Sequence, residues 1–197
     1  MPINPSFLLA NKGFTLIETI IGIVVLGISF AILTTLIHPL AQQSAEQLHQ
    51  VKAAALANSV LNEIQNKAFD NNSDMAGGIV RCGEAAAPIC TLSSLLGPED
   101  DVDGRADDKE TSRALFDDVD DYHGLEYGAG QIENSQGVVL SEYIGYQMSI
   151  SVCNDANYDG ICSGNSVDDE SSAKLITVTI TIPTNFSMNF STYRTNF

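Results

Sequence analysis

Hydrophobic residues are concentrated in an uncharged stretch near the start of the chain. Residues 19–37 form a run of 19 positions without a charged side chain, and most of them are branched and aliphatic. A helix of this length rises about 28 Å, close to the roughly 30 Å core of a bilayer. A cleaved secretory signal has a shorter apolar core of about 7–15 residues, followed by a small-x-small site. No such site stands at residues 38–40, so the pattern predicts a retained membrane-spanning helix.

A second helical pattern follows this run. Residues 40–69 contain no glycine and no proline. Apolar residues recur there at helical spacing, at Ala53, Leu56, Ala57, Val60, Leu61, Ile64 and Ala68. Such a face predicts packing onto a soluble domain. We expect one helix from Phe14 to about Phe69, broken or kinked near Pro39, because proline lacks the N–H of the helical ladder.

The C-terminal half shows the period of β-strands. Apolar and polar residues alternate over 144–152 and again over 176–182, which predicts two half-buried antiparallel strands. Residues 138–140 indicate a third strand, and the tail 185–197 an edge strand. The predicted fold class is therefore α+β, with a long N-terminal transmembrane helix packed on a small antiparallel sheet.

Charge separates the two halves further. The chain has 25 acidic and 9 basic residues, a formal net charge of −16, and 11 of the acidic residues fall within residues 99–121. A chain this acidic repels nucleic acid, so we expect no nucleic-acid partner. Divalent cations and basic partner surfaces remain compatible with the composition. The 44% share of hydrophobic residues excludes a wholly disordered acidic chain.

Glu18 stands at the start of the apolar run, where a carboxylate is costly unless it is paired or interfacial. The segment Lys12–Glu18, with the sequence KGFTLIE, resembles the processing site of type IV prepilins and type II secretion pseudopilins. In that family a membrane peptidase cuts after the glycine, the new N-terminal phenylalanine is methylated, and the glutamate is needed for assembly. The resemblance implies cleavage between Gly13 and Phe14, an N-methylated Phe14, and Glu18 as the assembly carboxylate.

The resemblance also implies an organisation for the whole chain. Residues 1–13 would be the leader, 14–37 the transmembrane helix, 38–69 a helical stalk, and 70–197 a pilin-like globular domain. The protein would cross the inner membrane once, with its C-terminal domain in the periplasm or on a surface pilus. Its partners would be prepilin peptidase, the inner-membrane assembly platform and other pilins or pseudopilins. No cofactor is required by this function. An ordinary N-terminal anchor is the competing interpretation.

Four cysteines, Cys82, Cys90, Cys153 and Cys162, lie in the exported part. An even number in such a domain favours disulfides over free thiols. Three connectivities are open, and we favour Cys82–Cys90 with Cys153–Cys162 because each pair brackets a short loop. Zinc is disfavoured because no C-x₂-C pair is present.

Two acidic loops suggest calcium. Asp155, Asn157 and Asp159, followed by Gly160, match the start of an EF-hand-type loop, although Ser166 replaces the glutamate expected at its twelfth position. Asp168 or Asp169 would have to substitute for that ligand, and a solvated Asx-rich turn is the alternative. A second, weaker candidate is the loop from Glu99 to Gly104, with Glu110 at its twelfth position.

The segment Phe116–Gly124 places four aspartates beside His123. A membrane-anchored metal-dependent enzyme would need these side chains to converge on a pocket. We favour a surface loop whose Phe116, Val119 and Tyr122, spaced by three, tuck onto the domain. No phosphate-binding loop, nucleophile elbow or Cys/His pair accompanies the segment, so we predict that the chain is not an enzyme.

The same segment and the paired cysteines ahead of it resemble a minor pilin of the mannose-sensitive haemagglutinin (MSHA) type. The resemblance implies a minor subunit that assembles through its N-terminal helix. A minor pseudopilin of a type II secretion system is the alternative. A tip adhesin is a third candidate, in which aromatic residues of the tail contact a sugar or a surface, namely Phe186, Phe190, Tyr193 and Phe197.

Overall fold

The structure is a computed structural model, which describes residues 13–73, 81–99, 110–162 and 172–196. The chain divides into two compact units, Met1–Glu46 and Gln47–Phe197. The helix α1 (Leu16–Gln65) runs from the first unit into the second. The remaining elements belong to the second unit.

One helix, α1, accounts for both helical patterns of the sequence. It continues through Pro39 as one helix, so of the break or kink expected there, the break is wrong. The helix ends at Gln65, earlier than Phe69, because the chain then joins the acidic segment instead of completing another turn. Ala68 forms a parallel bridge with Asp118, and its N–H donates to the Asp117 carbonyl at 3.2 Å.

The sheet has four antiparallel strands in the order β1-β2-β3-β4. They are β1 (Glu126–Tyr127), β2 (Gln147–Asn154), β3 (Ala173–Thr181) and β4 (Ser187–Thr195). The two strands predicted from alternation are confirmed, with shifted starts, as β2 and β3. The predicted edge strand in the tail is confirmed as β4.

Two details of the strand prediction are wrong. β2 begins at Gln147 because Gly145 adopts a left-handed φ of 87°, directly after the 3-10 turn η3 (Ser141–Tyr143). Residues 138–140 do not form a strand, and only Val139 makes an isolated bridge, with Glu133.

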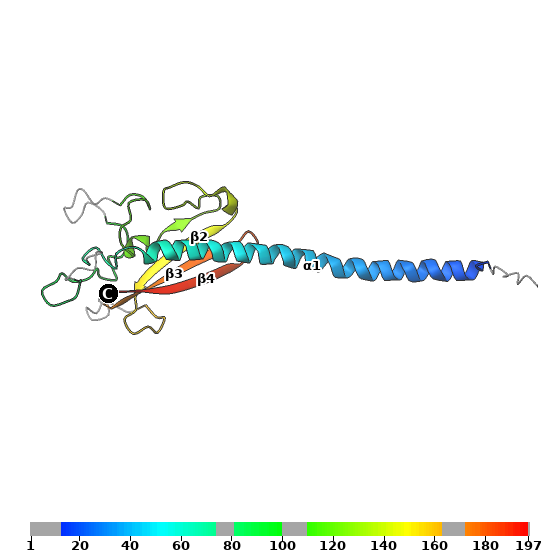
Figure 1. Cartoon of the computed structure of the whole chain (residues 1–197), viewed down its shortest axis with the longest axis horizontal. Coiled ribbons are helices and arrows are strands. Elements are labelled where there is room, and N and C mark those ends of the chain that lie inside the picture. Colours follow the sequence, from blue (N-terminus) through cyan, green and yellow to red (C-terminus); the bar gives the residue numbers. More distant parts are fainter. Residues whose placement is uncertain (1–12, 74–80, 100–109, 163–171, 197) are drawn as a thin grey trace, which may run out of the picture. The chain divides into compact units, whose positions relative to one another are not determined.

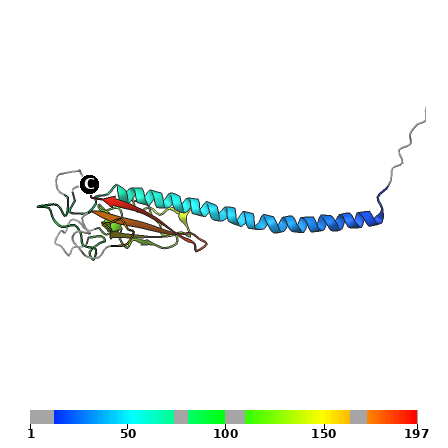
Figure 2. The ribbon, with the colours of Figure 1, turned by 90° about the horizontal axis from the view of Figure 1, so that it is seen from below.

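The C-terminal part of α1 packs against one face of the sheet (Figures 1 and 2). The helix contributes Ala53, Leu56, Ala57, Val60, Leu61 and Ile64 to a core shared with buried β2 and β3 residues. The predicted packing face is therefore confirmed. The fold class is α+β, with a pilin-like arrangement of a long N-terminal helix and an antiparallel sheet.

The acidic segment is a buried turn and not a surface loop. Phe116, Val119 and Tyr122 join the same core, as their spacing predicts. Asp118, Asp120 and Asp121 are buried as well, because these apolar residues hold the 3-10 helix η2 (Asp120–Tyr122) and the residues before it against the domain, whereas Asp117 is exposed. The expectation of a surface loop is therefore wrong for three of the four aspartates.

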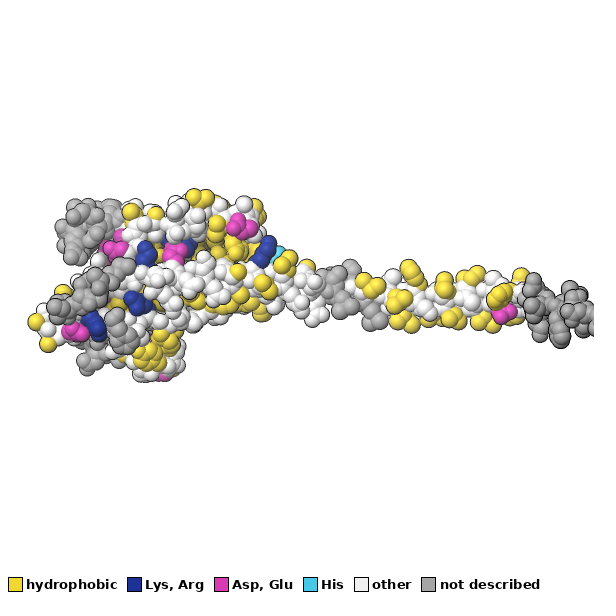
Figure 3. Space-filling view, viewed as in Figure 1, with side chains coloured by type: hydrophobic (Ala, Val, Ile, Leu, Met, Phe, Trp, Pro, Cys, Tyr) yellow, Lys and Arg dark blue, Asp and Glu magenta, His cyan; other side chains and the backbone are white. Residues whose placement is uncertain are grey.

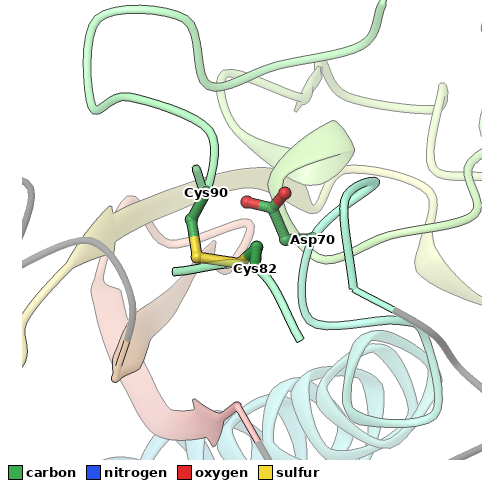
Figure 4. A group of neighbouring side chains, drawn as sticks. All are labelled: Asp70, Cys82 and Cys90. Atoms are coloured by element: carbon green, nitrogen blue, oxygen red, sulfur yellow. A yellow bond between two sulfur atoms is a disulfide. The ribbon is translucent and has the colours of Figure 1, made fainter. Parts of the chain in front are cut away.

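Two disulfides join Cys82 to Cys90 and Cys153 to Cys162. These are the local pairs that the sequence favours. Cys82 and Cys90 form a small buried cluster with Phe69, just beyond the end of α1. Figure 4 shows this disulfide beside Asp70. Its two sulfur atoms are bonded to each other, so they are not available as metal ligands.

Candidate functional site

The predicted processing site lies immediately before α1. Phe14 is 82% exposed, and its ring contacts no core of its own unit. Gly13 does not adopt a left-handed φ, and a Cβ built on it would meet nothing within 4 Å. The described fold therefore contains no steric reason for a glycine at this position.

Thr15 caps the helix that follows. Its hydroxyl oxygen accepts a hydrogen bond from the Glu18 backbone N–H at 3.3 Å, and its carbonyl accepts one from the Thr19 N–H at 3.2 Å. Thr15 and Glu18 have the spacing of a capping box, and a carboxylate in the first turn favours the positive end of the helix dipole. The T-x-x-E pattern signals this local role, which sequence reasoning missed. Glu18 thus takes part in the cap through its backbone N–H, and its carboxylate lies in the first turn of the helix.

The apolar span Leu16–Thr35 has no side chain buried inside the protein. Figure 3 shows hydrophobic side chains distributed along this part of α1. Its hydroxyl groups are satisfied within the helix: Ser29 donates to the Val25 carbonyl at 2.8 Å and Thr35 to the Ile32 carbonyl at 2.8 Å. A helix that satisfies its own polar groups and exposes apolar side chains on all sides suits a bilayer.

One face of this span combines a carboxylate with small residues. It is formed by Phe14, Glu18, Thr19, Gly22, Ile23 and Leu26. A Cβ on Gly22 would meet nothing within 4 Å, so the glycine makes no contact that its own chain requires. Glycine in a helix interior costs about 1 kcal/mol relative to alanine, whereas small residues let helices approach closely in a membrane.

The loop that resembles an EF-hand is held by protein hydrogen bonds. Asp155 Oδ2 accepts the Gly160 N–H at 2.9 Å and the Tyr193 hydroxyl at 2.7 Å, and its Oδ1 accepts the Asp159 N–H at 3.2 Å. Burial raises the pKa of Asp155, but these hydrogen bonds lower it by more, to below its ordinary value. The Asn157 amide donates to Asp159 Oδ2 at 3.0 Å. The arrangement is an Asx-type turn. Ser166 at the twelfth position and the expected substitutes Asp168 and Asp169 lie outside the described residues.

The structure buries an ion cluster that the sequence did not reveal. Lys174 of β3 is fully buried, and its Nζ donates to Asp70 at 3.1 Å and to Asp120. The same ammonium lies 4.8 Å from the centre of the Phe69 ring. Burial lowers the pKa of Lys174, but the carboxylates of Asp120 and Asp70 raise it by more, so its pKa lies above the ordinary value. The cluster ties β3 and η2 to the chain that follows α1.

Further carboxylates surround Asp120. Asp118 and Asp121 are buried in the same turn, and Glu99 and Glu110 approach it from the preceding segment. Burial raises the pKa of Glu110 to about 7 and those of Asp118 and Asp121 to about 10. Glu99 and Glu110 are therefore brought together, although residues 100–109 of the proposed second calcium loop lie outside the described residues.

His123 does not join these carboxylates. Its Nδ1 accepts the Val152 backbone N–H at 3.2 Å, which ties the end of η2 to β2. Asp118, Asp120 and Asp121 are 0% exposed, so a substrate in solvent cannot reach them.

Part of the aromatic tail packs into the domain. Phe190 packs against the core, and the Tyr193 hydroxyl donates to Asp155. Phe197 lies outside the described residues.

Comparison with known proteins identifies the N-terminal segment. Residues 8–34 match the family model described as the prokaryotic N-terminal methylation motif. No curated protein and no solved structure matches the chain. The matched residues include the predicted cleavage site, Glu18 and most of the apolar span. The motif and the exposed apolar helix indicate a membrane-anchored precursor with a prepilin-type processing and methylation segment.

Proposed function

We propose that this protein is a minor subunit of an MSHA-type type IV pilus, similar to the minor pilin MshD. The observation that carries the proposal is the methylation motif at residues 8–34, placed on a helix whose apolar span has no partner inside the protein. Lateral association with the helices of other pilins would cover this span. The acidic segment 116–124 and the cysteine pairs, which resemble an MSHA minor pilin, support the finer assignment.

Processing would occur in the inner membrane, with the C-terminal domain in the periplasm. Cleavage after Gly13 would release the leader and create a cationic amine on Phe14, which the peptidase would then methylate. The absence of any steric need for Gly13 in the fold supports a requirement that comes from the enzyme that reads this segment. Gly13→Val is therefore expected to block cleavage and leave the fold intact.

Assembly would depend on the Glu18 carboxylate. In a bundle of apolar helices, an uncompensated carboxylate costs several kcal/mol, about 2.5–3.5 on insertion scales. The methylated amine of Phe14 on a neighbouring subunit would supply the missing positive charge. Because each partner is costly without the other, the pair would fix the axial position of one subunit against the next.

Incorporation into fibres tests this proposal. Glu18→Ala is expected to be processed, to stay in the membrane and to be depleted at least tenfold from sheared fibres. Glu46→Ala is the matched control, because Glu46 is an exposed carboxylate on the same helix beyond the apolar span, and it should assemble like the wild type. Equal incorporation of the Glu18→Ala subunit would contradict the proposal.

A minor pseudopilin of a type II secretion system is the second candidate, because the same motif serves both assemblies. Deletion of the gene distinguishes them. Loss of MSHA pili with normal protein secretion supports the pilus subunit, whereas accumulation of exoproteins in the periplasm with normal pili supports the pseudopilin. Calcium at Asp155, Asn157 and Asp159 is a separate proposal for this protein, and a second bound ion that Asp159→Asn removes would support it.

A further inference from the structure

Five carboxylates from two segments converge beside η2. The nearest ligand oxygens of Glu99, Asp118 and Asp120 lie within 4.8 Å of one another, and the same holds for Glu99, Glu110 and Asp121. Glu99 belongs to both groups. Two hydrogen bonds join Glu99 to Glu110. The Glu99 N–H donates to Glu110 Oε2 at 3.4 Å, and the Glu110 N–H donates to the Glu99 carbonyl at 3.4 Å.

In the first group, every member has an oxygen without a hydrogen-bond partner among the described residues. These atoms are Glu99 Oε2, Asp118 Oδ2 and Asp120 Oδ2, and each is buried. Asp118 and Asp120 are 0% exposed. Asp121 adds a fourth such atom, its Oδ1. Native proteins rarely leave buried carboxylate oxygens unpaired, because each one loses its hydration without compensation.

The other oxygen of each aspartate is fixed in place. Asp118 Oδ1 accepts the N–H groups of Asp120 at 2.7 Å and Asp121 at 3.3 Å. Asp121 Oδ2 accepts the N–H groups of Asp117 at 2.8 Å and Asp118 at 2.9 Å. Asp120 uses Oδ1 for Lys174. Backbone and lysine donors thus hold one side of each carboxylate, and the opposite oxygens remain for a ligand.

The local charge is unbalanced. Within the part of the chain that the structure describes, Lys174 is the cation that pairs with this cluster, and it also pairs with Asp70. Among the described residues, one ammonium group therefore pairs with Asp70 and Asp120, and four further carboxyl groups lie beside Asp120. A bound cation would supply both the missing charge and partners for the orphan oxygens.

We propose that Glu99, Asp118 and Asp120 bind one Ca²⁺ ion, with Asp121 as the adjoining fourth carboxylate. A ligand set made only of oxygen atoms selects a hard cation over zinc or copper. Ca²⁺ is favoured over Mg²⁺ because it accepts irregular coordination by side chains from separate segments, whereas Mg²⁺ demands near-ideal octahedral geometry. The ion would fasten Glu99 to Asp118 and to η2 and, through Asp120 and Lys174, to β3.

The test uses the full chain in detergent micelles, stripped with EDTA and then supplied with CaCl₂ alone. Native mass spectrometry counts bound ions, and near-UV circular dichroism gives the unfolding temperature. Asp118→Asn keeps the Oδ1 acceptor of the turn and removes the charge, and Glu99→Gln changes a ligand outside regular structure. Asp159→Asn is the matched control in the loop that resembles an EF-hand.

We expect one Ca²⁺ bound at this site and a rise in the unfolding temperature of about 5 °C or more once calcium exceeds its Kd about 100-fold. Asp118→Asn and Glu99→Gln should each remove this ion and this rise, and Asp159→Asn should preserve both. A near-UV spectrum in EDTA that matches the wild type is the control that each variant is folded. No binding up to about 5 mM, above the Kd range of extracellular calcium modules, would overturn the proposal. Loss of the ion in Asp159→Asn alone would overturn it as well.

Discussion

Arg113 is the residue whose removal should most clearly reveal how the acidic segment is attached to α1. Its Nε and Nη2 donate to the two carboxylate oxygens of Glu63 at 3.0 and 2.7 Å, and its Nη1 donates to the Glu133 carbonyl at 2.7 Å. The Tyr122 hydroxyl donates to the same Glu63 at 2.9 Å. Burial raises the pKa of Tyr122, so the phenol stays protonated and remains a donor.

Arg113→Met keeps much of the aliphatic volume and removes all three hydrogen bonds. Breaking a buried ion pair from one side costs about 3–5 kcal/mol, because the remaining charge is left without compensation. The Glu63 side chain is 17% exposed and retains Tyr122, so we expect the lower end, about 3 kcal/mol. For a folded unit of this size, the loss corresponds to a fall of about 6–12 °C in the unfolding temperature.

Urea and thermal unfolding of the full chain, followed by near-UV circular dichroism in EDTA, measure this loss. Arg81→Met is the matched control. Its partner Glu84 lies 3.9 Å away and both side chains are largely exposed, at 42% and 50%, so the pair should contribute less than about 1 kcal/mol. In a double-mutant cycle with Glu63→Gln, the two losses should be non-additive by about 2 kcal/mol. Equal losses in Arg113→Met and Arg81→Met, or strict additivity in the cycle, would show that the pairing adds nothing.

Three further predictions concern the same domain. Lys174→Met should destabilise the EDTA-treated protein by about 3–5 kcal/mol in urea unfolding, because the two carboxylates that it pairs with stay buried; a loss below about 1 kcal/mol would contradict the ion cluster. Replacing Cys153 and Cys162 by serine together should cost about 2.5 kcal/mol, the loop-closure entropy for a separation of 9 residues, and an unchanged urea midpoint would disagree with it. Tyr193→Phe should lower stability at neutral pH, where Asp155 is ionised and accepts the Tyr193 hydroxyl. Because the pKa of Asp155 lies below its ordinary 3.8, this deficit should close as the pH falls through that region in an acid-unfolding series, and a deficit independent of pH would argue against the pairing.

The elements that could be predicted from sequence are those with a local period. Side-chain direction in each element produces the helical face of residues 53–68 and the alternation in β2 and β3. The packing of the helix on the sheet could therefore be predicted from the sequence. The two-residue strand β1 has no period to detect, and it forms because Glu126 and Tyr127 pair with β2. Residues 138–140 are apolar, yet Val138 and Val139 are exposed, and the backbone of Val138 bonds to Asn134 in a turn instead of joining the sheet.

The buried charges depend on contacts that are distant in sequence. Asp70 and Lys174 are 104 residues apart, and no local pattern joins them. The alternation of β3 could have predicted the burial of Lys174, because Lys174 lies on the same side of the strand as the inward-facing Ile176 and Val178. The sequence predicted a surface loop at residues 116–124, but Asp118, Asp120 and Asp121 are buried there. Their burial follows from Phe116, Val119 and Tyr122, whose apolar side chains carry the turn between them into the core.

N-terminal mass spectrometry of the protein purified from native membranes decides whether the chain is a processed prepilin. The motif at residues 8–34 and the unpartnered apolar span predict a mature chain that begins with N-methylated Phe14. An intact Met1, or a first residue beyond Ile37, would contradict prepilin processing and leave Glu18 as an interfacial carboxylate at the start of the apolar helix.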